Sequence, residues 1–205
     1  HIAAERLITT SLELGGKSPT IVLADADIDL AVKGVVYGIF SSAGQACIAG
    51  SRLFVAQEIY QEFMNKLVAA TQGLRIGHPE KSGMHLGSLI NEKHLNSVDG
   101  YVQLAKSEGG TVLCGGERIV DGEHAKGCFY LPTIITGLNN SARVCQEEIF
   151  GPVLVAIPFA DEAALLAEAN DSIYGLAAGI WTENYRKAMQ LARALEVGTV
   201  WVNTY

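Results

Sequence analysis

Short runs of β-branched and apolar residues alternate along the chain with longer segments in which apolar residues recur at every third or fourth position. The short runs predict strands, and the longer segments predict amphipathic helices. An acidic stretch at 25–29 favours a helix N-terminus there. The expected strands are 19–23, 51–56, 111–114, 153–159, 176–182 and 199–202, and the expected helices are 28–40, about 58–72, 91–108, 161–170 and 184–196.

Alternation of this kind is typical of α/β layers. One segment departs from it, because residues 115–130 are rich in glycine and charge and follow neither period. We expect a hairpin or a surface excursion there. No linker, internal repeat or low-complexity tract divides the chain, so we expect residues 1–205 to form a single α/β domain.

Composition excludes several classes of protein. The 205 residues are 49% hydrophobic and 18% charged, which is enough apolar material for a sizeable core and argues against intrinsic disorder. No apolar run approaches the roughly 18 residues of a membrane span, so we expect no membrane partner. The formal net charge of −7 lacks the basic footprint of nucleic-acid binding, and we expect no nucleic-acid partner.

The cysteines and histidines predict neither disulfides nor a metal site. Four cysteines are too sparse for a disulfide scaffold, and no two form a C-x-x-C pair, so we expect a reducing, cytoplasmic location. The five histidines do not combine with them at metal-ligand spacing, and we expect no metal. The chain starts at His1 without a signal pattern, which we interpret as a segment of a longer chain.

The first candidate motif is Leu12–Lys17, in which Glu13 is followed by two glycines directly before a predicted strand. Glycines allow close backbone approach or a positive φ at that point. A solvated glutamate before a turn is the common explanation for such a segment on its own.

The second motif is Ser42–Ile48, a loop of small residues that carries Cys47 between a predicted helix and a predicted strand. Substrate could approach a cysteine in such a loop, and a stabilised thiolate there would be a strong nucleophile. The alternative is a buried structural cysteine, since free cysteine is among the most buried residue types.

The third motif is Gln146–Val153, where adjacent carboxylates precede an aromatic residue and a Gly-Pro turn. Either Glu147 or Glu148 could accept hydrogen bonds from ligand hydroxyls, and Phe150 could stack on a flat ring. Solvated loop carboxylates and a core phenylalanine are the more common explanation for any one such patch.

Taken together, LELGGKSP, GQAC and EEIFGPV resemble the aldehyde dehydrogenase superfamily in order and spacing. The resemblance continues through NDSIYGL (170–176) and GTVWVN (198–203) and so covers essentially the whole chain. It implies a three-layer sandwich, with helices on both faces of a mostly parallel twisted sheet. It also implies that residues 1–205 are the catalytic domain, that the coenzyme-binding domain lies upstream, and that the full-length protein is a homodimer or homotetramer.

The resemblance further implies an oxidoreductase that converts an aldehyde to a carboxylic acid with NAD or NADP, NAD being favoured. Cys47 matches the catalytic thiol and Glu13 the general base. Glu148 matches the carboxylate that holds the nicotinamide ribose, Phe150 the aromatic residue beside the nicotinamide, and the Leu14 carbonyl a contact to the carboxamide. Other coenzyme and oxyanion groups of the family lie upstream of this motif, so we expect the isolated segment to be inactive.

Two other classes of function remain open from the residues alone. Cys47 and Glu13 could serve a thiol hydrolase or acyl transferase that uses no nicotinamide. A non-catalytic structural protein could also have retained the fold. Formation of reduced nicotinamide by the full-length protein would favour an oxidoreductase over the thiol hydrolase or acyl transferase. A Cys47 thiol that resists labelling at neutral pH would favour the structural protein.

Overall fold

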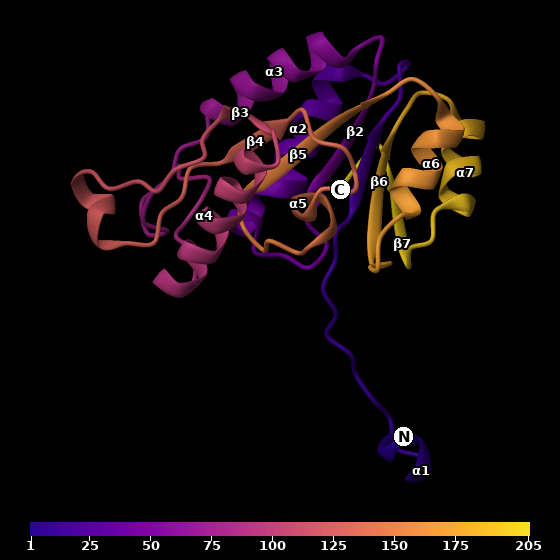
Figure 1. Cartoon of the computed structure of the whole chain (residues 1–205), viewed down its shortest axis with the longest axis horizontal. Coiled ribbons are helices and arrows are strands. Elements are labelled where there is room, and N and C mark those ends of the chain that lie inside the picture. The colour runs from indigo at the N-terminus through magenta and orange to yellow at the C-terminus, as the bar shows by residue number, and fades with distance from the viewer.

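Seven strands form one sheet in the order β3-β4-β5-β2-β1-β6-β7 in a computed structural model that describes residues 1–205 (Figure 1). Neighbouring strands are parallel except β3 and β4, which pair antiparallel. The strands are β1 (Pro19–Val22), β2 (Arg52–Ala56), β3 (Thr111–Cys114), β4 (Thr133–Thr136), β5 (Val153–Phe159), β6 (Ala177–Trp181) and β7 (Thr199–Val202).

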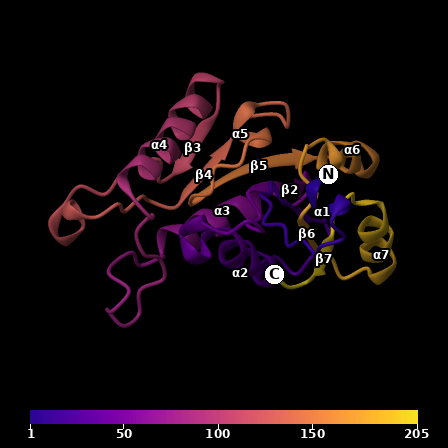
Figure 2. The same ribbon diagram turned by 90° about the horizontal axis from the view of Figure 1, so that it is seen from below.

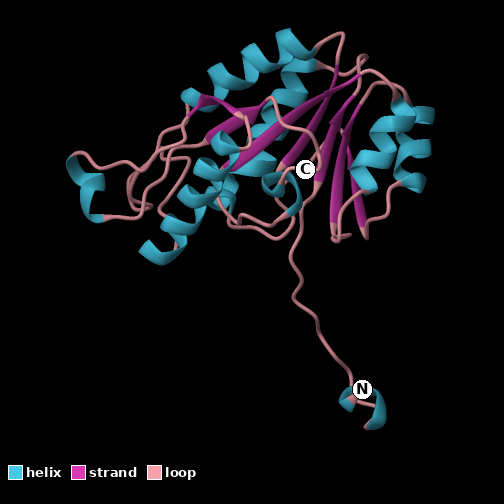
Figure 3. Ribbon diagram, viewed as in Figure 1, coloured by secondary structure: helices cyan, strands magenta, loops and turns pink.

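Helices cover both faces of this sheet. Helices α2 and α3 pack together on one face, while α4, α5 and α6 lie on the other (Figure 2). The helices are α1 (Ile2–Glu5), α2 (Ile28–Phe40), α3 (Tyr60–Gln72), α4 (Glu92–Ser107), α5 (Arg143–Gln146), α6 (Glu162–Asn170) and α7 (Tyr185–Ala194). The expected three-layer α/β fold with a mostly parallel sheet is confirmed (Figure 3).

Local side-chain chemistry explains where four of the long helices begin. In each, the residue before the first helical position accepts a hydrogen bond from a backbone N–H of the first turn, which satisfies a donor that the helix itself leaves free. These capping residues are Asp27, Asn91, Asp161 and Asn184. The pattern of apolar residues places the same helices within two residues of their observed ends.

The sequence pattern also predicted six of the strands, and it missed β4. That strand has four residues, all but one of them buried, and so it is too short for a period to be visible. The segment 115–130 is a surface excursion that contains a short 3₁₀ turn at Gly122–Lys126. Its ends are joined by a single bridge between Arg118 and Tyr130, so it is no regular hairpin.

The first 18 residues differ from everything that follows. Apart from the four-residue helix α1, they contain no regular secondary structure, and Figure 1 shows them reaching away from the sheet. Residues 4–14 are all exposed, whereas the chain is buried from Gly16 to Leu23. None of the helices has the length and apolar character needed to cross a bilayer.

Candidate active site

The sheet order brings the three motif segments together. Strands β5, β2 and β1 are neighbours, with Arg52 paired to Pro19 on one side and to Val155 on the other. The three motifs occupy the loops that lead into these strands, so they meet at the amino ends of β1, β2 and β5. Ligands in open α/β sheets usually bind at the carboxyl ends of strands, and this site therefore lies at the opposite edge.

The loop that carries Cys47 begins with a strained turn. After α2 the chain passes through three consecutive left-handed residues, Ser42 (φ 52°), Ala43 (φ 55°) and Gly44 (φ 70°). For a residue with a side chain this conformation costs roughly 1–2 kcal/mol, so contacts with the rest of the fold must hold the turn. Cys47 itself is partly buried, and its backbone N–H donates to no acceptor in the chain.

Two glycines allow the motif segments to approach one another closely. A Cβ on Gly16 would overlap the carbonyl oxygen of Cys47, and a Cβ on Gly44 would overlap the carbonyl of Gly151. The first contact joins the LELGGK segment to the cysteine loop, and the second joins that loop to the EEIFGPV segment. Glycine is therefore required at both positions by packing, and at Gly44 also by the positive φ.

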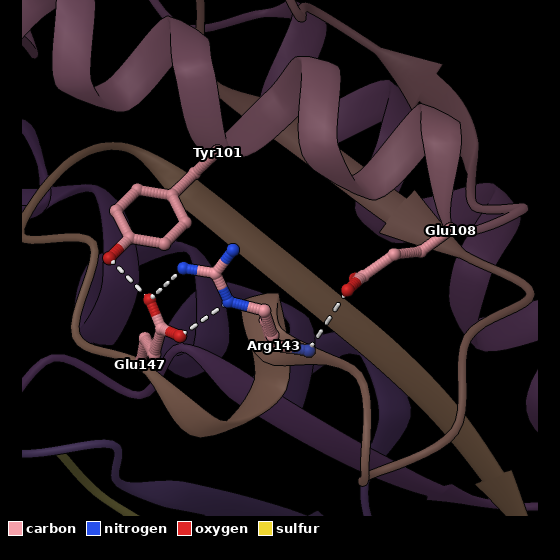
Figure 4. Close-up of polar contacts among 4 residues, drawn as sticks. All are labelled: Tyr101, Glu108, Arg143 and Glu147. Carbon is pink, nitrogen blue, oxygen red and sulfur yellow. Dashed lines mark hydrogen bonds and ion pairs between the residues drawn. The ribbon is translucent and has the colours of Figure 1, made fainter.

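The adjacent carboxylates Glu147 and Glu148 have different surroundings. Arg143 holds Glu147 with two hydrogen bonds of 2.7 and 3.0 Å, and Tyr101 donates a third of 2.9 Å (Figure 4). These donors, Arg143 first, lower the pKa of the Glu147 carboxyl. Glu148 instead accepts one bond, of 3.0 Å, from the backbone N–H of Gly16, and its Oε2 has no partner in the chain. Glu148 is therefore the carboxylate with a free oxygen.

Phe150 follows this carboxylate two residues along the chain in a left-handed conformation (φ 57°), and the residue is 39% exposed. The Nε2 atom of His94, in the first turn of α4, is 2.7 Å from the Phe150 carbonyl oxygen. The two rings meet edge to face with their centres 6.2 Å apart. A contact between α4 and the EEIFGPV segment thus holds an exposed aromatic ring next to Glu148.

Glu13 and Leu14 are not part of this cluster. Both are exposed, and the Glu13 side chain makes no hydrogen bond or ion pair with the rest of the chain. They lie on the segment that leads away from the sheet (Figure 1). The structure therefore brings Cys47, Glu148 and Phe150 together through their loops and leaves Glu13 and Leu14 exposed, with no hydrogen bond to them.

A buried pair of basic residues behind the site was not predicted from the sequence. Arg52 donates to the carbonyls of Lys17 (2.9 Å) and Ala169 (2.8 Å) and to the side chain of Asn140 (2.9 Å). The ammonium group of Lys17 is buried without a hydrogen-bond partner, and burial lowers its pKa to about 7. The only signal for Arg52 was a charged residue inside the predicted strand 51–56, and no pattern marked Lys17 as buried.

No group of three or more histidine, cysteine, aspartate or glutamate side chains is arranged so that it could hold a metal ion.

Several solved structures are similar to this chain over 99% of its length. HpcC from Thermus thermophilus is 45% identical with a TM-score of 0.94. Aldehyde dehydrogenase from Bacillus cereus, in an NAD+ complex, is 41% identical with a TM-score of 0.93. Betaine aldehyde dehydrogenase from Staphylococcus aureus, in complex with NAD+, is 38% identical with a TM-score of 0.95.

The chain spans 40% of the length of each of these structures. Residues 1–205 also match, in full, the family described as the aldehyde dehydrogenase family. The order of the motifs along the sequence and their meeting at one sheet edge agree with that match. The chain therefore belongs to the aldehyde dehydrogenase family.

Proposed function

We propose that this chain is the thiol-bearing catalytic part of an enzyme that oxidises an aldehyde to a carboxylic acid with NAD or NADP, NAD being favoured. The observation that carries the proposal is the meeting of the Cys47 loop with Glu148 and Phe150 at one sheet edge, in a chain of this family. The NAD+ complexes among the similar structures support a nicotinamide coenzyme.

The residues present fit the nicotinamide half of such a coenzyme. Glu148 has an oxygen without a partner that can accept hydrogen bonds from ribose hydroxyls. The exposed ring of Phe150 can lie against a flat heterocycle. The Leu14 carbonyl lies outside this cluster, and its contact to the carboxamide is proposed from the family resemblance alone. When bound, the nicotinamide supplies a hydride acceptor.

Cys47 is the nucleophile in this proposal. Its thiolate forms a C–S bond to the aldehyde carbon, and the carbonyl electrons move onto oxygen to give a tetrahedral adduct. The backbone N–H of Cys47, which has no partner in the chain, can donate to that oxyanion. Loss of the aldehyde hydrogen as hydride then leaves an acyl group on Cys47 as a thioester.

Glu13 is the general base for the second half of the reaction. Its carboxylate takes a proton from water, the water oxygen bonds to the thioester carbon, and the C–S bond breaks to release the acid and the Cys47 thiolate. Overall, one aldehyde, one water and one oxidised coenzyme give one acid, one reduced coenzyme and one proton. For this step Glu13 must be brought to the thiol, because its side chain is exposed and makes no hydrogen bond or ion pair within residues 1–205.

We further propose a homodimer or homotetramer in a reducing compartment such as the cytoplasm. The four cysteines are unpaired, which supports such a compartment. Size-exclusion chromatography with light scattering on the intact protein measures the oligomeric state. A monomer would contradict the proposed homodimer or homotetramer.

Rapid mixing of the intact protein with an aldehyde and NAD+ tests the proposed reaction. A burst of reduced nicotinamide equivalent to the thiol sites is the expected result. A thiol hydrolase would instead release acid from an activated ester without producing reduced nicotinamide. A structural protein would do neither, and its Cys47 would resist iodoacetamide at neutral pH.

A further inference from the structure

Gln45, two residues before Cys47, connects the cysteine turn to a distant segment through its side-chain amide. The Nε2 atom donates to the carbonyl of Ser42 at 3.2 Å and to that of Ser88 at 3.5 Å. The Oε1 atom accepts from the backbone N–H of Ile90 at 2.9 Å. The amide of Gln45 is thus satisfied on both sides by backbone groups, one in its own turn and two in the segment 88–90.

The turn needs such external support. The left-handed conformations of Ser42 and Ala43 are intrinsically unfavourable, so the turn persists only where other contacts favour it. On the other side of the thiol, the Tyr205 hydroxyl donates to the carbonyl of Ile48. Cys47 therefore lies between two anchored residues, and Gln45 provides the anchor on the side of the strained turn.

The segment that Gln45 reaches is itself fixed and leads directly to the other part of the site. The N–H of Leu89 donates to the Cys128 carbonyl at 2.8 Å. Asn91 then caps α4 by accepting from the backbone N–H of His94, and the His94 ring contacts the Phe150 carbonyl. The start of α4 thus joins the cysteine turn, through Gln45, to the loop that holds Phe150.

We propose that Gln45 is a positioning residue, which fixes the Cys47 turn on the start of α4 and so sets the thiol relative to Phe150 and Glu148. This inference rests on the proposed function, in which Cys47 is the nucleophile. It assigns no chemical step to Gln45. A thiol displaced by even about 1 Å can lose two orders of magnitude in rate, so the hydrogen bonds of this amide matter for turnover.

Two variants of the intact protein separate the bonds of the amide. Gln45→Met removes all three, while Gln45→Glu retains an acceptor for Ile90 and places a carboxylate oxygen against two carbonyls. Gln103→Met, on the exposed surface of α4, is the matched control, since the amide of Gln103 contacts only Asp99 in its own helix. The readouts are kcat, the KM for coenzyme, the unfolding midpoint, and amide hydrogen exchange at Ile90.

We expect Gln45→Met to lower kcat by about 10- to 100-fold with little change in the coenzyme KM, and to accelerate exchange at Ile90. Gln45→Glu should lower kcat while exchange at Ile90 stays slow, and Gln103→Met should change neither. A kcat within about twofold of the wild type in Gln45→Met, or an equal loss in Gln103→Met, would overturn the proposal.

If Gln45→Met fails to fold, Gln45→Glu tests the proposal in its place. An unchanged kcat in Gln45→Glu would contradict the positioning role. Failure of the proposed function gives a different result. In that case the wild-type protein itself forms no reduced nicotinamide, while the hydrogen-exchange difference at Ile90 persists.

Discussion

The two halves of the candidate site are built in different ways. The loops that carry Cys47, Glu148 and Phe150 are fixed by buried neighbouring strands and by glycine contacts. Hydrogen bonds also hold them: Gly16 donates to Glu148, Gln45 accepts from Ile90, and His94 of α4 contacts the Phe150 carbonyl. Residues 8–14, which carry Glu13 and Leu14, have no regular structure, are exposed, and reach away from the sheet.

This difference separates the two chemical steps of the proposed reaction. Three of the groups proposed for thiol addition and hydride loss, namely Cys47, Glu148 and Phe150, lie in the ordered region. Hydrolysis of the thioester depends on Glu13, whose position must be set by whatever packs against residues 8–14 in the intact protein. Variants in the two regions should therefore fail at different steps.

The largest effect is expected at Cys47. In the intact protein, Cys47→Ala should reduce aldehyde oxidation by at least about 10³-fold, because it removes the proposed nucleophile. Coenzyme binding, followed by calorimetry, should stay nearly unchanged. Cys114→Ala on the edge strand β3 is the control and should keep full activity. Substantial turnover by Cys47→Ala would assign the nucleophile elsewhere.

The next effect is expected at Glu13, in the exposed region. Glu13→Gln keeps the shape and removes the base, so steady-state turnover should fall by about 10²- to 10⁴-fold. Rapid mixing should still show one fast equivalent of reduced nicotinamide, and Glu5→Gln serves as an exposed control. If the burst itself disappears, Glu13 acts on the thiol and the separation of the steps is wrong.

A smaller effect on turnover is expected at Glu148, and the adjacent Glu147 serves as its control. Glu148→Gln should raise the coenzyme KM and slow hydride transfer by about tenfold, because an amide replaces one of the acceptor oxygens with a donor. A primary isotope effect with deuterated aldehyde should appear. Glu147→Gln removes a charge that Arg143 and Tyr101 already satisfy and should leave both quantities nearly unchanged. Equal effects in the two variants would contradict the different roles.

The smallest effect on turnover is expected at Lys17, whose ammonium group is buried in the ordered region. The quantity expected to change there is the free energy of unfolding. The unfolded chain keeps this proton up to a pKa near 10.5, and the folded chain only up to about 7. The folded protein therefore gains stability as pH rises from about 7 to 10.5, and this contribution is lost as pH falls through that window. Lys17→Met should be more stable than the wild type near neutral pH, by an amount on the order of a few kcal/mol.

Urea unfolding of the wild type and of Lys17→Met at several pH values measures this difference. The gap between the two proteins should shrink as pH rises. Burial raises the pKa of the Cys145 thiol to about 11, which acts in the opposite direction above pH 9. The charge of Lys17 itself lowers the pKa of this thiol, so the two proteins are compared below pH 9, where Cys145 stays protonated in both. A gap that does not change with pH would mean that Lys17 is charged in the folded state throughout.

The sequence predicted the helices and strands in which a pattern of apolar residues extends over several consecutive positions. The helix at 28–40 and the strand at 153–159 were predicted with their observed ends, since each gives a clear apolar pattern. Strand β4 was missed because four residues carry no period. The convergence of the three motifs depends on the order of strands in the sheet, which periodicity does not encode, and it was expected only through the resemblance to a family.

Two features of the site could not have been predicted from patterns. The Gln45 amide contacts backbone groups more than 40 residues away, and such contacts leave no periodic signal. Lysine is rarely buried without a partner, so the burial of Lys17 contradicts the ordinary expectation for its residue type.

The most direct test of the central claim is to trap the acyl group on Cys47. The Glu13→Gln variant of the intact protein is mixed with an aldehyde and NAD+, quenched in acid during the slow phase, digested and examined by mass spectrometry. We predict that the peptide containing Cys47 gains the mass of the acyl group, and that no gain occurs when NAD+ is omitted. An unmodified Cys47 peptide beside a full burst of reduced nicotinamide would contradict the thioester mechanism and the role of Cys47 in it.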